Sequence, residues 1–258
     1  MNEFLLIAIA AFTASALTFF SGFGLGTILM PVFALFFPVH TAVALTAVVH
    51  FLNNIFKLGL TGFFADKSVI LRFGIPATIA AFAGAELLTW MSASEPVASY
   101  YLGHTIFYIR WEKIMMAIVM IIFALLEIIP TWSQIHFDPK YLLYGGILSG
   151  FFGGLSGHQG ALRSAFLLRL GLSKESFIAT GVVIACMIDI TRLGVYGLTV
   201  FNENIVAHWP PLLTAISCAF GGAFLGNRFL KKMTIALLQK SVALFLIALA
   251  CALATGII

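Results

Sequence analysis

The stretch NIFKLGLTG at residues 54–62 returns 135 positions later, at residues 189–197, as DITRLGVYG. Each copy ends a long apolar segment in a half of the chain that also holds a glycine-rich stretch. Such self-similarity in a hydrophobic chain indicates a duplicated membrane fold, and folds of that kind place a substrate site between their two related halves.

The composition indicates whether water or lipid surrounds the chain. Of the 258 residues, 61% are hydrophobic and 9% are charged, and the mean hydropathy is +1.07. A soluble domain of this size needs far more charge on its surface, so we predict a multi-pass protein of the cytoplasmic membrane. The net charge of +4 fits an excess of Lys and Arg on the cytoplasmic side, and we predict no nucleic-acid partner. The three cysteines are widely spaced and indicate neither a disulfide framework nor a metal site.

Ten apolar segments, five in each half, can be read from the sequence. Polar residues and two prolines at 130–140 separate a first repeat at 1–130 from a second at 141–258. The aromatic-rich loop at 93–112 is typical of an interfacial belt. The expected segments are 3–20, 24–38, 41–63, 69–92 and 113–130, then 141–156, 160–171, 175–198, 209–229 and 235–257.

Glycine-rich stretches at 21–26 and 153–160 each interrupt an apolar run that is too long for one crossing of about 20 residues and short for two. If the chain starts outside and reverses at each stretch, most basic residues gather on the inner face, as the positive-inside rule expects. These are Lys67, Arg72, Lys140, Arg169, Lys174, Arg228, Lys231 and Lys232. Reversals give each half an odd number of crossings. We therefore predict an all-α integral membrane protein with two inverted repeats of about five helical segments each and Gly-rich helix breaks.

A helix that begins inside the membrane presents free N–H groups and a partial positive charge, and such an end attracts anions. The helices after the two breaks are expected to begin near residues 24–27 and 157–161. Glycines that only permit close helix packing are the alternative interpretation. The candidate substrate-binding residues are Gly24, Gly26, Thr27, Gly157, His158, Gln159, Gly160 and Arg163.

Arg163 is the most informative of these residues, because a guanidinium inside the membrane is costly without a partner. The alternatives are that it reaches the membrane interface or forms a structural pair with Asp189. His158 is either a core residue or a ligand contact or proton carrier.

Four polar residues of the repeated stretches are candidates for coupling or charge balance: Asn54, Lys57, Asp189 and Arg192. Asp189 and Arg192 share a helical face and could pair, and Asn54 and Lys57 repeat that spacing. Lys57 and Arg192 lie about five residues from their helix ends, so we expect both to anchor at the membrane interface. Asp189 lies deeper, where it would balance Arg163 or carry a coupled proton.

The order of these motifs resembles the sulfite exporter TauE/SafE family of membrane permeases. In the first half the cluster Gly22, Gly24 and Gly26 is followed by Pro31, Ala42 and Thr46. In the second half Gly154, Gly157 and Gly160 are followed by Ala165, Ser176 and Thr180. The stretch GGAFLGNR at 221–228 also resembles the family's penultimate helix, so the resemblance covers nearly the whole chain. The chain departs from the family pattern at Leu25, His158, Gln159 and Ala165, which suggests altered ligand chemistry.

The resemblance implies a secondary transporter, usually an exporter, of sulfite, organosulfonates or related sulfur oxyanions, with no cofactor. We expect a small anionic substrate, coupling to protons or sodium, and a bilayer as the surroundings; the oligomeric state is left open. The alternatives are a transporter of another small anion, such as a carboxylate, and a non-catalytic membrane subunit. An enzyme is not expected, because the sequence contains no HExxH motif, paired aspartate motif or activated cysteine.

The threading can be tested by labelling single cysteines in intact cells. We expect reagents that do not cross the membrane to label the 199–208 loop and to spare the 228–234 loop, because the basic residues lie at the latter. Labelling with the opposite sidedness would remove the basis for the inverted repeat.

Overall fold

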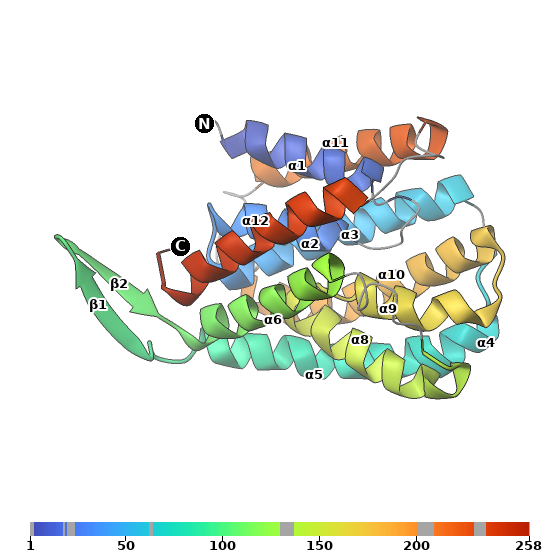
Figure 1. Ribbon diagram of the computed structural model, residues 1–258, viewed down its shortest axis with the longest axis horizontal. Coiled ribbons are helices and arrows are strands. Elements are labelled where there is room, and N and C mark those ends of the chain that lie inside the picture. The colour runs from blue at the N-terminus through green and yellow to red at the C-terminus, as the bar shows by residue number, and fades with distance from the viewer. Residues whose placement is uncertain are drawn as a thin grey trace.

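The protein is a bundle of helices of unequal length (Figure 1). The computed structural model describes residues 3–17, 19, 24–61, 64–129, 137–200, 209–229 and 236–257. The ten segments expected from the sequence are helical in the parts described, apart from short stretches at some of their ends. The first half holds α1 (Glu3–Leu17), α2 (Leu25–Ala34), α3 (Val39–Thr61), α4 (Lys67–Val69), α5 (Ile75–Ser92) and α6 (Trp111–Ile128). The second half holds α8 (Leu142–Ser156), α9 (Gly160–Leu167), α10 (Lys174–Val200), α11 (Trp209–Phe229) and α12 (Ala236–Ala254).

The outer surface of the bundle is apolar. Among the described residues, four helices are long and apolar enough to cross a membrane: Val39–Leu60, Lys67–Ser92, Lys174–Gly197 and Trp209–Arg228. Large hydrophobic side chains face outward, and Ile79, Trp90 and Leu244 are each more than 65% exposed. Water would not tolerate so many apolar side chains at the surface, whereas lipid does. The chain is thus an all-α integral membrane protein.

A β-hairpin stands where the sequence predicted an aromatic loop. Strand β1 (Ala98–Leu102) pairs antiparallel with β2 (Thr105–Ile109), and Gly103 takes a left-handed φ of 63° in the turn between them. The hairpin projects from one end of the bundle (Figure 1). Its aromatic residues include Tyr101, 74% exposed, and Tyr100, whose hydroxyl donates to the Thr255 carbonyl at 2.8 Å.

The chain reverses at the second glycine-rich break. Helix α8 ends at Gly157, where the left-handed φ of 81° suits glycine. Helix α9 then returns, because Phe166 and Leu167 at its end pack with Leu142 at the start of α8. Phe137, which precedes α8, stacks on Phe166 with ring centroids 4.1 Å apart. At the first break Gly24 also has a left-handed φ, of 114°, immediately before α2.

Each main helix pair joins a helix of the first half to a helix of the second. Replacing every helix by its equivalent in the other half reproduces the same set of pairs. Helix α5 packs on α8 and α1 on α11, while α3 packs on α10 and α6 on α12. Helices α3 and α10 run in opposite directions, because the Asp66 amide that follows α3 donates to Thr180 near the start of α10 at 2.8 Å. This is the arrangement that inverted repeats predict, with the halves interleaved rather than side by side. Their opposite orientation in a membrane stays a prediction.

Two glycine seams bring neighbouring helices into backbone contact. A methyl group added at Gly150 or Gly154 of α8 would overlap the backbone of α5, and one at Gly146 the backbone of Phe73 just before α5. A methyl group added at Gly222 or Gly226 of α11 would overlap the backbone of α1. Small residues at such interfaces allow the close approach on which helix association in lipid depends. These glycines therefore hold the two long packing pairs together.

We expect Gly150→Ala to destabilise the protein by about 1–3 kcal/mol, because overpacking forces α5 and α8 apart. The matched control is Gly194→Ala in α10, where an added methyl meets nothing within 4 Å. Thermal unfolding in detergent should show a lower Tm for the first variant and an unchanged or higher Tm for the second. Equal melting of both would mean that the seam does not determine helix packing.

Candidate functional site

The two glycine-rich breaks meet inside the bundle. A methyl group on Gly26 would lie 3.1 Å from the Gly157 carbonyl oxygen, so the backbones of the two breaks are in contact. Helix α2 begins after Gly24 and α9 after Gln159, and among the described residues no side chain caps either start. Two helix N-termini with uncapped first turns thus lie close together, one from each half of the chain.

Polar side chains are buried around these breaks. They come from α1, α2 and α3 in the first half and from α8, α9, α10 and the second break in the second half. Buried polar and ionisable groups are rare within membranes and are usually functional. The buried polar set is Ser15, Thr27, Thr46, His50, Asn53, Asn54, Lys57, Ser149, Ser156, His158, Gln159, Arg163, Ser164, Asp189 and Arg192.

Asp189 is the hub of this set and has no exposed surface. One carboxylate oxygen lies 2.6 Å from His50 Nδ1. The other accepts hydrogen bonds from Gln159 Nε2 at 3.2 Å and from Arg192 Nε at 3.0 Å. The carboxylate therefore ties α3 of the first half to α10 and to the break of the second half.

Arg163 is linked to Asp189 through Gln159. Its Nη1 donates to Gln159 Oε1 at 3.4 Å, so Gln159 stands between the guanidinium and Asp189. The guanidinium also lies against Gly181 of α10, where an added methyl would be 3.4 Å from Nε. Lys57 is close enough for its charge to repel that of Arg163. The Lys57 ammonium lies 5.6 Å from the centroid of the Phe19 ring.

Positive charge exceeds negative charge in this buried set. Lys57, Arg163 and Arg192 are at most 5% exposed, and Asp189 is the single carboxylate that the described residues place among them. Arg192 and His50 share that carboxylate, with Arg192 Nη2 at 2.8 Å. Several cations close together in an apolar medium attract negative charge, so the arrangement fits a small anion as the ligand.

Arg192 points toward the second break. A methyl group on Gly157 would lie 2.9 Å from Arg192 Nη1, so the guanidinium is close to the backbone of the break. Within the described part of the chain Nη1 is buried and has no hydrogen-bond partner. A charged N–H group is thus directed at the backbone where the two breaks meet.

His158 sits in a more apolar part of the second break. Its ring stacks on Phe123 of α6 with centroids 5.3 Å apart, and Nδ1 lies 3.1 Å from the Ser156 carbonyl. Its Nε2 is buried without a partner among the described residues. His158 is packed as a core residue on one face and keeps one unused ring nitrogen on the other.

The structure corrects the expected positions of Lys57 and Arg192. Interface anchoring is wrong for both, since they are 5% and 0% exposed inside the bundle. The reason is that α3 and α10 pack on each other, with Arg192 against Gly157 of the second break, so side chains near these helix ends face the interior of the bundle. Arg163, 3% exposed, does not snorkel either. Asp189 and Arg192 do pair, whereas Asn54 contacts His50, with Nδ2 3.1 Å from Nδ1, instead of repeating that pair with Lys57.

Several polar residues at the site were missed from the sequence. His50 is the most important, and Ser15, whose hydroxyl donates to Asn53 at 3.1 Å, is another. A signal was present: Thr46, His50, Asn53 and Lys57 form a polar stripe at helical spacing in an otherwise apolar segment. His50 has no counterpart in the repeat, because Ala185 occupies the matching position.

Comparison with known proteins agrees with this architecture. The family model described as sulfite exporter TauE/SafE matches residues 7–253. The chain belongs to this family. No curated protein and no solved structure matches it.

Membership in the TauE/SafE family has direct consequences for function. The family consists of membrane permeases, so this TauE/SafE protein is a transporter and not an enzyme. Its substrates are small sulfur-related anions, and it works within a lipid bilayer. The buried excess of positive charge at the two breaks is consistent with an anionic substrate.

Proposed function

We propose that this TauE/SafE protein exports sulfite, an organosulfonate or a related sulfur oxyanion across the cytoplasmic membrane, through a site between the two glycine-rich breaks. The observation that carries the proposal is the burial of Lys57, Arg163 and Arg192 in a set whose described carboxylate, Asp189, pairs with Arg192 and His50. An oxyanion bound here would neutralise the remaining positive charge. It would also accept hydrogen bonds from the first turns of α2 and α9.

The proposed ligands divide into neutral donors and charged ones. Backbone N–H groups near Gly26 and Gly160, with the Thr27 hydroxyl, would contact the oxyanion from the helix starts. Arg163 would supply the main charge, since its planar fork of N–H groups matches the oxygens of a sulfite or sulfonate group. Arg192 Nη1 supports the same position, because it is directed at Gly157 and lacks another partner in the described chain.

Alternating access would then consist of movement of the α5 and α8 pair against the α1 and α11 pair, each of which contains one helix from each half. The polar contacts that join the halves at this level are few and centre on Asp189 and His50. Contacts of this kind can break and reform more readily than the glycine seams of α5 with α8 and of α1 with α11. We propose that the seams move as rigid units and that the site opens to each side in turn.

Proton coupling would depend on the same carboxylate, Asp189. Protonation of Asp189 would remove its negative charge and weaken its bonds to His50, Gln159 and Arg192. The net charge of the site would then be more positive by one, and the site would bind an anion more tightly. A proton and an anion would therefore occupy the protein together and cross together, and His50 is the proposed route for the proton to the carboxylate.

We expect Arg163→Gln to abolish the stabilisation of the purified protein by sulfite and sulfonates in a thermal-shift assay. Arg163→Lys should recover part of it, because an ammonium lacks the bidentate fork. The control is Arg169→Gln, which removes the same charge from an exposed position just beyond α9. A carboxylate series tested beside the sulfur oxyanions identifies the substrate class. If Arg163→Gln binds sulfur oxyanions normally while remaining monodisperse, the proposed site is wrong.

Coupling is tested with Asp189→Asn, which mimics the protonated carboxyl group. We expect the variant to bind anions at high pH as tightly as the wild type does at low pH, and to keep anion exchange in proteoliposomes. Net transport driven by a pH gradient should be lost, because the carboxyl can no longer release a proton. Loss of exchange together with a lower Tm would instead make Asp189 a structural partner of Arg192, with a cost typical of a broken buried ion pair, about 3–5 kcal/mol.

A further inference from the structure

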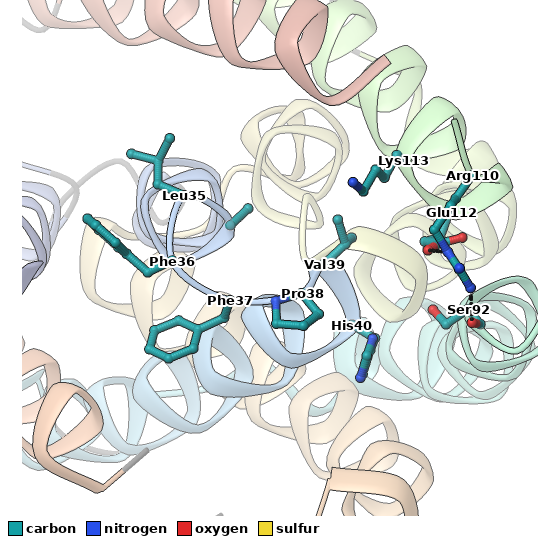
Figure 2. Close-up of a pocket in the computed structure, with 11 residues that line it drawn as sticks. Leu35, Phe36, Phe37, Pro38, Val39, His40, Ser92, Arg110, Glu112 and Lys113 are labelled. Atoms are coloured by element: carbon teal, nitrogen blue, oxygen red, sulfur yellow. Dashed lines mark hydrogen bonds and ion pairs between the residues drawn. The ribbon is translucent and has the colours of Figure 1, made fainter. Parts of the chain in front are cut away.

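A cavity of about 450 Å³ lies at the end of the bundle where α2 and α5 end and where α3 and α6 begin. Its polar lining consists of His40, Ser92, Arg110, Glu112 and Lys113, and the rest comes from residues 34–39 (Figure 2). None of these residues belongs to the central site described above. The first turns of α3 and α6 and the last turns of α2 and α5 line the cavity, so the partial charges of the helix ends offset one another and side chains determine its charge.

The charged groups of this cavity differ in how they are held. Arg110 is fixed: its Nε donates to Glu112 Oε1 at 2.7 Å, and its Nη2 donates to the carbonyls of Ser92 and Ser94 at 3.0 Å each. The Lys113 side chain instead points from α6 toward the middle of the cavity (Figure 2). Arg110 and Glu112 neutralise each other, so Lys113 gives the cavity its net positive charge.

Glu112 carries the second observation that points to a ligand. The residue is 5% exposed, and its Oε2 is buried without a hydrogen-bond partner among the described residues. A buried carboxylate oxygen that accepts no hydrogen bond is costly, so a donor on a bound molecule is the natural complement. The cavity thus pairs an ammonium that suits an anion with an acceptor that suits an N–H or O–H group.

The same helices connect this cavity with the central site. Going inward from the cavity, Val43 of α3 and Met116 and Met120 of α6 are buried in one apolar cluster with Met30 of α2. Phe123 follows on α6 and stacks on His158 of the second break. Methionine side chains repack easily, so this apolar layer can act as a closed but deformable barrier.

We infer that the cavity is a second substrate station, on the α3 and α6 side of the apolar barrier, for a small oxyanion that also carries a hydrogen-bond donor. The oxyanion contacts Lys113 and the donor contacts Glu112 Oε2. This inference rests on the proposed transport function, because the station lies in line with the central site. It also identifies a substrate feature, a hydroxyl or amino group, that the central site does not select.

The test uses a matched pair of sulfonates, 2-hydroxyethanesulfonate and ethanesulfonate, with the full-length protein in liposomes of neutral lipid. Transport is measured with substrate added at the cavity side and, separately, at the opposite side. We expect Lys113→Gln to raise the half-saturating concentration about tenfold at the cavity side only, as loss of a charge-assisted hydrogen bond predicts. Lys113→Arg should restore most of it. Lys140→Gln, which removes an exposed lysine outside the cavity, is the control.

Glu112→Leu tests the second contact. We expect wild type to prefer the hydroxylated sulfonate at the cavity side and Glu112→Leu to lose that preference. The inference is overturned if Lys113→Gln leaves the half-saturating concentration unchanged at both sides while transport continues, an outcome that leaves the central site intact. It is also overturned if Lys113 matters only after an anionic lipid is added, since the occupant is then a lipid headgroup. Absence of transport by the wild type in every arm would instead contradict the proposed function.

Discussion

The structure depends on the burial of more positive than negative charge within a membrane-embedded core. Lys57, Arg163 and Arg192 lie inside the bundle, and the described residues offer them one carboxylate, Asp189. Desolvating a cation costs several kcal/mol even after relaxation, and a single shared carboxylate offsets only part of that cost. We propose that a bound anion stabilises this arrangement for part of the working cycle of the permease.

The remaining features of the fold surround and position these buried charges. The glycine seams hold α5 against α8 and α1 against α11 at backbone contact, and they leave the centre to the shorter helices α2 and α9. Those helices begin where the breaks meet, so their first turns add partial positive charge to the basic side chains. Asp189 joins the two halves through His50, and His50 and Gln159 each contact one of its two oxygens. Helices in backbone contact thus surround a polar centre in which the Asp189 side chain joins the two halves.

Much of this arrangement could be predicted from the sequence, and the reasons for the exceptions are physical. Helix positions follow from apolar runs long enough to cross a bilayer, and the reversal at Gly157 follows from glycine's tolerance of a left-handed backbone. Arg163 and Asp189 stood out because ionisable groups are rare in such runs. The depth of Lys57 and Arg192 could not be predicted, since depth depends on how α3 and α10 cross the bundle. His50 was missed because it lies outside the repeated stretch, and the hairpin at 98–109 because its aromatic residues also suit an interfacial loop.

The most direct test of the central claim is to locate an oxyanion in crystals of the protein. Selenate resembles sulfate in shape and charge, and its selenium scatters anomalously, so an anomalous difference map marks its position without reference to the protein density. A selenium peak about 4 Å from the Arg163 guanidinium nitrogens, beside the first turns of α2 and α9, is the predicted result. Selenate that binds only elsewhere, with Arg163 and Arg192 satisfied by protein groups, would contradict it.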